Sequence, residues 1–144
     1  MSRSAPVNTW QQLHWNAALT TAAATALLER LATAPSLGVL ALEVHATANG
    51  ARWLIGTSTP AADGVRELVE GSTLATISAP RAKRQAVTMA AQVAVSRPQM
   101  SLSADRAEAI ARGLLSALNG LRGSEHLVLQ VLLGGRLTPS QLTA

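Results

Sequence analysis

The stretch of residues 103–134 constrains the fold of this chain more than any other part. Apolar residues recur after Ser103 at helical spacing, which predicts a long amphipathic helix with one buried stripe: Ala107, Ile110, Ala111, Leu114, Leu118 and Leu121. This helix is expected to end at Gly120 or Gly123. The following run, 127–133, is apolar except for Gln130, which is typical of a central strand covered on both faces or by a partner. We therefore expect the rest of the chain to pack around a helix and a strand that carry no chemistry of their own.

A hairpin is the clearest local pattern upstream. Residues 39–47 alternate between apolar and polar side chains, as a half-buried strand does, and residues 52–58 are again strand-like. Asn49 and Gly50 lie between them and tolerate the positive φ that a tight turn requires. The sequence therefore predicts two antiparallel neighbours joined at Asn49–Gly50.

The remaining elements are predicted from periodicity and from proline and glycine positions. The first is a helix over residues 9–33, closed by Pro35. The others are a short helix opened by Thr59 and Pro60 and closed by Gly71, a strand over 73–78, a loop over 79–84, a strand over 87–95 and a connector over 97–102. The predicted order is α-β-β-α-β-β-α-β.

This order predicts an α+β fold. Residues 52–134 alone give β-α-β-β-α-β, the ferredoxin-like or split βαβ arrangement, with a mostly antiparallel sheet and helices on one face. The first helix and strand would be an N-terminal addition to it. A chain of 144 residues matches the size of one domain. We expect a flexible arm at 1–8, a single domain at 9–136 and an irregular tail at 137–144.

Composition limits the chemistry that is available. The chain is 48% hydrophobic but only 2% aromatic, so its core must be built from Ala, Leu and Val. It contains no cysteine, which excludes disulfides and thiolate metal ligands. We identify neither a signal peptide nor a membrane-spanning segment, and we expect a cytoplasmic location.

No pattern of catalytic residues stands out. Neither a phosphate-binding glycine loop nor a metal-binding histidine pair is present, and the serines and threonines lie at predicted caps and turns. Glu43 and His45 share one strand face, so the carboxylate could orient the imidazole, but a solvated polar face is the simpler interpretation. We therefore expect no enzyme activity, no cofactor and no metal.

The best candidates for a specific contact are basic. Arg81, Lys83 and Arg84 lie within four residues of the 79–84 loop, where they could neutralise phosphates or form a solvated tip. Trp53 could stack on a base, although the predicted strands lack the Phe and Tyr of RNA-binding sheets. These four residues are the candidate nucleic-acid or partner contacts.

Three segments resemble a known family. They are Leu27-Leu28-Glu29-Arg30-Leu31, the hairpin over 44–56 with Ala51-Arg52-Trp53-Leu54-Ile55-Gly56, and the run over 123–134 followed by Arg136 and Pro139. Together they resemble the N-terminal region of actinobacterial conjugative DNA-transfer ATPases, the coupling proteins of type IV secretion. The nucleotide-binding motifs of that family are absent from this chain.

The resemblance implies a non-catalytic accessory domain of a conjugative DNA-translocation apparatus. Its partners would be a motor ATPase domain or further copies of itself, at the cytoplasmic face of a membrane complex, with DNA contacted indirectly. Two alternatives remain: a nucleic-acid-binding domain that uses the basic loop, and a small-ligand regulatory domain.

Overall fold

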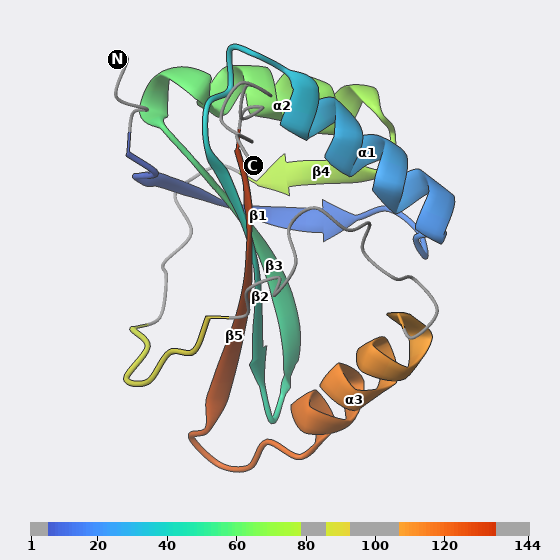
Figure 1. Cartoon of the computed structure of the whole chain (residues 1–144), viewed down its shortest axis with the longest axis vertical. Coiled ribbons are helices and arrows are strands. Elements are labelled where there is room, and N and C mark those ends of the chain that lie inside the picture. Colours follow the sequence, from blue (N-terminus) through green and yellow to red (C-terminus); the bar gives the residue numbers. More distant parts are fainter. Residues whose placement is uncertain (1–5, 79–85, 93–106, 135–144) are drawn as a thin grey trace, which may run out of the picture.

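The computed structural model describes residues 6–78, 86–92 and 107–134. The elements in this part of the chain are β1 (Thr9–Trp15), α1 (Thr21–Thr33), β2 (Leu40–Thr47), β3 (Gly50–Thr57), a 3₁₀ turn (Thr59–Ala61), α2 (Ala62–Gly71), β4 (Ala75–Ser78), α3 (Ala107–Asn119) and β5 (His126–Leu133). The strands form one antiparallel sheet in the order β4-β1-β3-β2-β5 (Figure 1). The predicted α+β class with an antiparallel sheet is confirmed.

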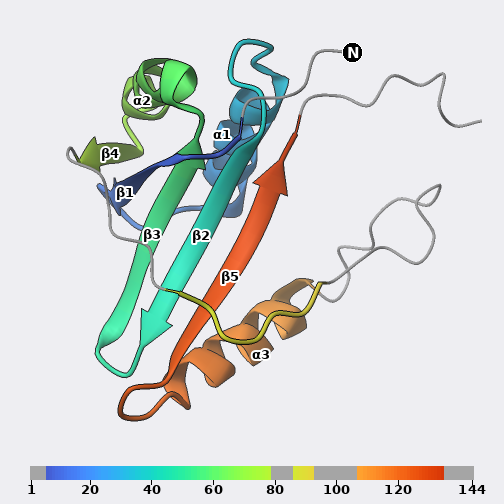
Figure 2. The ribbon, with the colours of Figure 1, turned by 90° about the vertical axis from the view of Figure 1, so that its left-hand side faces the viewer.

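The sheet has two distinct faces. On the first, which we call the helix face, lie Leu13 of β1, Ile55 of β3 and Leu42 of β2. Helices α1 and α2 lie on this side of the sheet (Figures 1 and 2). On the second, the far face, Trp10 and Glu43 belong to the opposite set of alternating residues. The buried core lies between the helix face and α1 and α2: Leu13, Leu27, Leu31, Leu37, Leu40, Ile55, Ala61, Val65, Val69, Ala75 and Ile77.

The predicted helix over 9–33 is wrong in its first part, where the chain forms β1. The buried residues of β1 include Thr9 and Gln11, and these polar side chains hide the two-residue alternation that marks a strand. Helix α1 begins after Thr20, whose hydroxyl accepts a hydrogen bond from the Ala23 amide at 3.2 Å. It ends ahead of Pro35, as predicted.

The predicted hairpin is confirmed. Thr47 pairs with Gly50 at the end of β2 and the start of β3, so the turn lies at residues 48–49, one residue before the predicted position. Gly50 has a φ of +127°, which a side chain would disfavour. Both strands are interior, because β1 covers the outer side of β3 and β5 covers the outer side of β2. The hairpin is therefore the centre of the sheet.

Helix α2 and strand β4 also match their predictions. Val65 and Val69 are buried on one side of α2, and Pro60 lies in the first turn of the preceding 3₁₀ segment. The residue that caps this turn is Ser58 rather than Thr59. The Thr59 hydroxyl instead donates to Asn8 Oδ1 at 3.1 Å, which ties the turn to the start of β1.

The predicted strand over 87–95 is wrong as far as it is described, since residues 86–92 contain no strand and Met89 is 88% exposed. The alternation there includes much alanine, which has low strand propensity and little apolar surface to bury. The β-α-β-β-α-β succession therefore lies at 9–78 rather than 52–134, and the additions are α3 and β5. Residues 1–5 of the predicted arm over 1–8, the basic loop, the Ser103 cap and the predicted tail lie outside the described residues. Asn8, the last residue of the predicted arm, is described, and its amide donates a hydrogen bond to the Thr57 carbonyl at 3.0 Å.

Gly56 of β3 is required by close packing on the far face. An ideal Cβ at Gly56 would lie 2.7 Å from two atoms of the Trp10 ring. We expect Gly56→Ala to lower the free energy of unfolding by about 1–3 kcal/mol, because the indole must move out of a packed position. Urea denaturation measures this change.

Gly71, at the end of α2, provides the matched control for this prediction. A Cβ there meets nothing within 4 Å, so Gly71→Ala should leave stability unchanged or raise it slightly. Equal effects of the two substitutions would contradict the packing role of Gly56.

Candidate interaction surface

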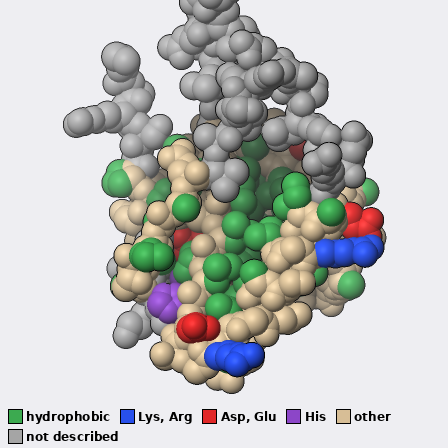
Figure 3. All heavy atoms as spheres, turned by 60° about the horizontal axis from the view of Figure 1, so that its bottom comes forward, with side chains coloured by type: hydrophobic (Ala, Val, Ile, Leu, Met, Phe, Trp, Pro, Cys, Tyr) green, Lys and Arg blue, Asp and Glu red, His purple; other side chains and the backbone are tan. Residues whose placement is uncertain are grey.

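The helices leave part of the helix face uncovered. Helices α1 and α2 lie over one end of the sheet, and α3 lies beside the other end, near the β2–β3 hairpin (Figure 1). A cavity of about 240 Å³ opens beside α1, with walls from α1, β1, β2, β3 and β5. The described residues that line it are all apolar, and Figure 3 shows hydrophobic side chains gathered in a hollow of the surface. We call this feature the apolar groove; residues that define it include Trp15, Leu28, Val44, Trp53, Leu129 and Val131.

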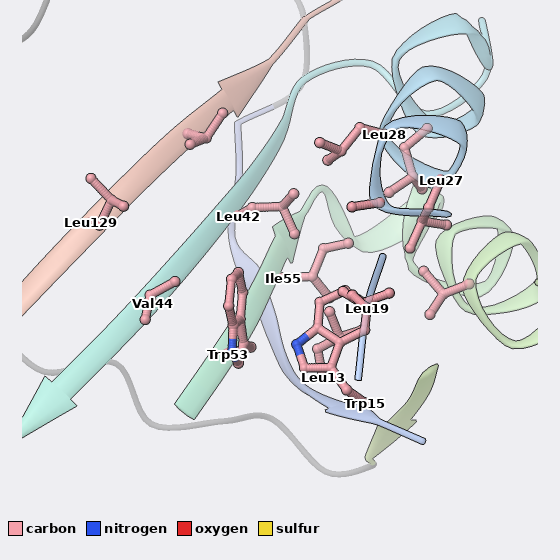
Figure 4. Close-up of a pocket in the computed structure, with 14 residues that line it drawn as sticks. Leu13, Trp15, Leu19, Leu27, Leu28, Leu42, Val44, Trp53, Ile55 and Leu129 are labelled. Carbon is pink, nitrogen blue, oxygen red and sulfur yellow. The ribbon is translucent and has the colours of Figure 1, made fainter. Parts of the chain in front are cut away.

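Two tryptophans form one wall of the apolar groove. The ring centroids of Trp15 and Trp53 are 5.5 Å apart and their planes are inclined by 84°, an edge-to-face arrangement (Figure 4). The buried Trp15 Nε1 has no hydrogen-bond partner among the described residues, and Figure 4 shows the edge of the ring that carries it directed towards Trp53. Such a pair is favoured because the positive edge of one ring meets the negative face of the other.

Trp53 is fixed in place yet accessible. The Trp15 pair holds its ring, and 37% of its surface remains exposed. The sequence singled out Trp53 as a partner contact together with Arg81, Lys83 and Arg84. The three basic residues lie outside the described residues, so their contact with nucleic acid stays a prediction.

Helix α3 does not bury the whole stripe that the sequence predicts. Leu118 and Leu121 are half-buried and, with the β2–β3 hairpin, line a second cavity. Ile110 is 61% exposed, Leu114 37% and Leu115 58%. Among the described residues, therefore, nothing buries the apolar side chains in the first turns of α3. The uncovered apolar surface of α3 adjoins the same side of the sheet as the apolar groove.

Strand β5 is not the central strand that its apolar run predicts. It pairs with β2 and forms the edge of the sheet (Figure 2). Its side chains are apolar on both faces, and Leu129, Val131 and Leu132 are 39%, 48% and 62% exposed. The sequence left two interpretations of this apolar run open. The described residues of this chain do not cover both faces of β5, and cover of β5 by a partner stays a prediction.

A buried polar cluster lies on the far face, where the sequence predicted a solvated one. Glu43 is 0% exposed and His45 5% exposed, and His45 Nε2 hydrogen-bonds to Glu43 Oε2 at 2.7 Å. Gln130 of β5, in register with Glu43, donates from Nε2 to Glu43 Oε1 at 2.6 Å. His45 Nδ1 is buried and has no hydrogen-bond partner within the part of the chain that the structure describes. The solvated interpretation is therefore wrong, because cross-strand pairing brings a polar residue from an otherwise apolar strand onto the carboxylate.

This cluster joins β2 to β5 across the sheet. Glu43, His45 and Gln130 line neither of the two cavities described here. No group of three or more metal-ligating side chains occurs in the described ranges, and no helix within them is long and apolar enough to cross a membrane. His126 hydrogen-bonds through Nε2 to the Ala86 carbonyl at 3.0 Å and so ties residues 86–92 to the start of β5.

Comparisons with known proteins add no relative to this description. No family model matches the chain, and neither a curated protein nor a solved structure shows significant similarity to it.

Proposed function

We propose that this chain is a non-catalytic protein-interaction domain that binds a partner protein in the apolar groove. The observation that carries the proposal is Trp53, an indole in edge-to-face contact with Trp15. It stays 37% exposed in a groove whose described lining residues are all apolar. Exposed apolar surface of this kind on a protein marks a binding site. Tryptophan is also the residue most enriched at the energetic centres of interfaces.

The polar residues of the chain support a non-catalytic role. The one histidine–carboxylate pair in the described residues is His45 with Glu43, and both side chains are buried on the face opposite the groove. A general base must come within hydrogen-bond reach of its substrate, and these two side chains line neither of the two cavities described above.

The resemblance to conjugative coupling proteins supplies the setting that we propose. In it, this chain is an accessory domain at the cytoplasmic face of a DNA-translocation complex, and the partner in the groove is an apolar segment of the motor ATPase domain. For the fold, we propose that residues 9–78 form a ferredoxin-like unit, because their elements run β-α-β-β-α-β with strand order β4-β1-β3-β2. Helix α3 and strand β5 extend that unit on the side of the groove.

The proposal is tested with the ATPase domain of an actinobacterial coupling protein and the full chain. We expect a complex by size-exclusion chromatography with light scattering, and binding at least about 30-fold weaker for Trp53→Ala, since loss of a central tryptophan costs about 2 kcal/mol or more. Met89→Ala removes a more exposed apolar side chain from the described segment 86–92, outside the groove, and should not weaken binding.

Two outcomes would contradict the proposal. One is the absence of any complex, and the other is equal binding by the Trp53→Ala variant and the unsubstituted chain. Saturable displacement of the hydrophobic dye ANS by a small apolar compound, with no protein bound, would instead favour the small-ligand alternative, because the groove is also a cavity of ligand size.

A further inference from the structure

The two edges of the sheet differ in how they are protected. Strand β4, at one edge, has four residues, and short edge strands are a common protection against unwanted pairing. Strand β5, at the other edge, has eight residues and contains neither proline nor a Lys, Arg, Asp or Glu side chain. Among the described residues it pairs with β2 alone. A long, apolar and uncharged edge strand is well suited to pair with a further strand.

The residue order of β5 is complementary to itself. When two copies are antiparallel with Gln130 opposite Gln130, Leu129 faces Val131 and Val128 faces Leu132 on either side of the centre. Leu127 then faces Leu133. Each apolar residue of this run meets an apolar residue, and the single polar residue meets its own copy.

Other registers lose this match. Side chains that are opposite each other in a sheet lie on the same face, so a two-fold axis perpendicular to the sheet allows registers that differ by two residues. A shift in one direction places Gln130 opposite Val128, and a shift in the other places it opposite Leu132. Both leave an amide against an apolar side chain.

We infer that two copies of this chain pair antiparallel through the outer edge of β5, centred on Gln130, to form a continuous ten-stranded sheet. The symmetric contact covers Leu129, Val131 and Leu132, the residues of β5 with large exposed apolar surface. The two apolar grooves then lie on the same face of the joined sheet. The inference rests on the proposed function only in that the chain is an interaction domain. Leu129 and Val131 also line the groove, but Leu132 does not, so a substitution at Leu132 separates the two surfaces.

The first test is the molar mass of the full chain by light scattering and sedimentation. We expect a mass about twice the 14.9 kDa of one chain. Leu132→Lys should raise the dissociation constant at least tenfold, because it places a charge in the edge pairing while it leaves the groove unchanged. Thr76→Lys is the matched control, since Thr76 is exposed on the far face of β4 at the opposite edge.

The second test reads the register and is independent of the first. The chain has no cysteine, so any interchain disulfide must form between the cysteines that are introduced. An oxidised mixture of the Val128→Cys and Leu132→Cys chains should form interchain disulfides, because these positions are opposite each other across the dyad. Each variant alone should form far fewer.

The outcomes separate this inference from the proposed function. A monomeric chain that still binds the ATPase domain, or a dimer that Leu132→Lys leaves intact, overturns the β5 pairing alone. A dimer that Leu132→Lys dissociates, but that does not bind the ATPase domain, supports the β5 pairing and overturns the proposed function alone. Cross-linking that is equal for all cysteine mixtures overturns the register.

Discussion

Glu43→Ala is expected to lower the free energy of unfolding by about 3 kcal/mol, one of the two largest effects that we predict for a single substitution in this chain. The Glu43 side chain is 0% exposed and accepts hydrogen bonds from two directions, one from His45 and one from Gln130. Its removal leaves the buried His45 ring and the exposed Gln130 amide without this acceptor. It also opens a cavity beside Leu54, which is 0% exposed and pairs with Glu43 in the sheet.

Urea denaturation measures the loss of unfolding free energy in Glu43→Ala, and two further variants show how much of it comes from the shared hydrogen bond. Gln130→Ala removes one of the donors and should cost about 1 kcal/mol. The double variant should cost less than the sum of the single variants, since the two residues share a hydrogen bond. Glu29→Ala, on the exposed side of α1, is the control for loss of a glutamate, and a loss at Glu43 no larger than at Glu29 would contradict the buried network.

Ile55→Ala is expected to destabilise the chain by about 2–5 kcal/mol. Ile55 is 0% exposed in the middle of β3, where it packs in the core under α1 and α2 and lies between Gln11 and Leu42 of the neighbouring strands. It also forms part of the floor of the apolar groove, so the truncation enlarges a cavity that is already open.

Leu28→Ala is the matched control for Ile55. Leu28 lines the same groove from α1 but is 36% exposed, and we expect its truncation to cost less than about 1 kcal/mol because most of the removed surface is not buried on folding. Chemical denaturation compares the two. Similar losses at both positions would show that the groove is closed in solution.

The parts of the fold that the sequence predicted correctly have local causes. The β2–β3 hairpin requires a positive φ that Gly50 supplies, and α2 shows its apolar spacing at Val65 and Val69. Strand β1 could not be recognised because Thr9 and Gln11 occupy buried positions that the alternation reserves for apolar residues. The edge position of β5 is set by its pairing with β2, a contact between distant parts of the chain that the composition of β5 does not encode.

The candidate surface was predictable in part for the same reason. Trp53 is a large residue of a rare type in a chain with so few aromatic side chains, so the sequence alone marks it as a candidate contact. Its neighbour Trp15 was placed on a helix by the sequence, and their contact depends on β1 and β3 lying side by side. Gln130 is conspicuous in the sequence as the single polar residue of an apolar run. Its contact with Glu43, however, depends on the pairing register of β2 and β5, which the sequence does not reveal.

The Trp15–Trp53 pair also gives the groove an optical readout. The chain has three tryptophans and neither tyrosine nor phenylalanine, and two of the three indoles meet at this site. Intrinsic fluorescence therefore arises in large part from the groove itself. Any molecule that enters it will change the emission of the unlabelled protein, so the first search for a natural ligand needs no dye and no tag.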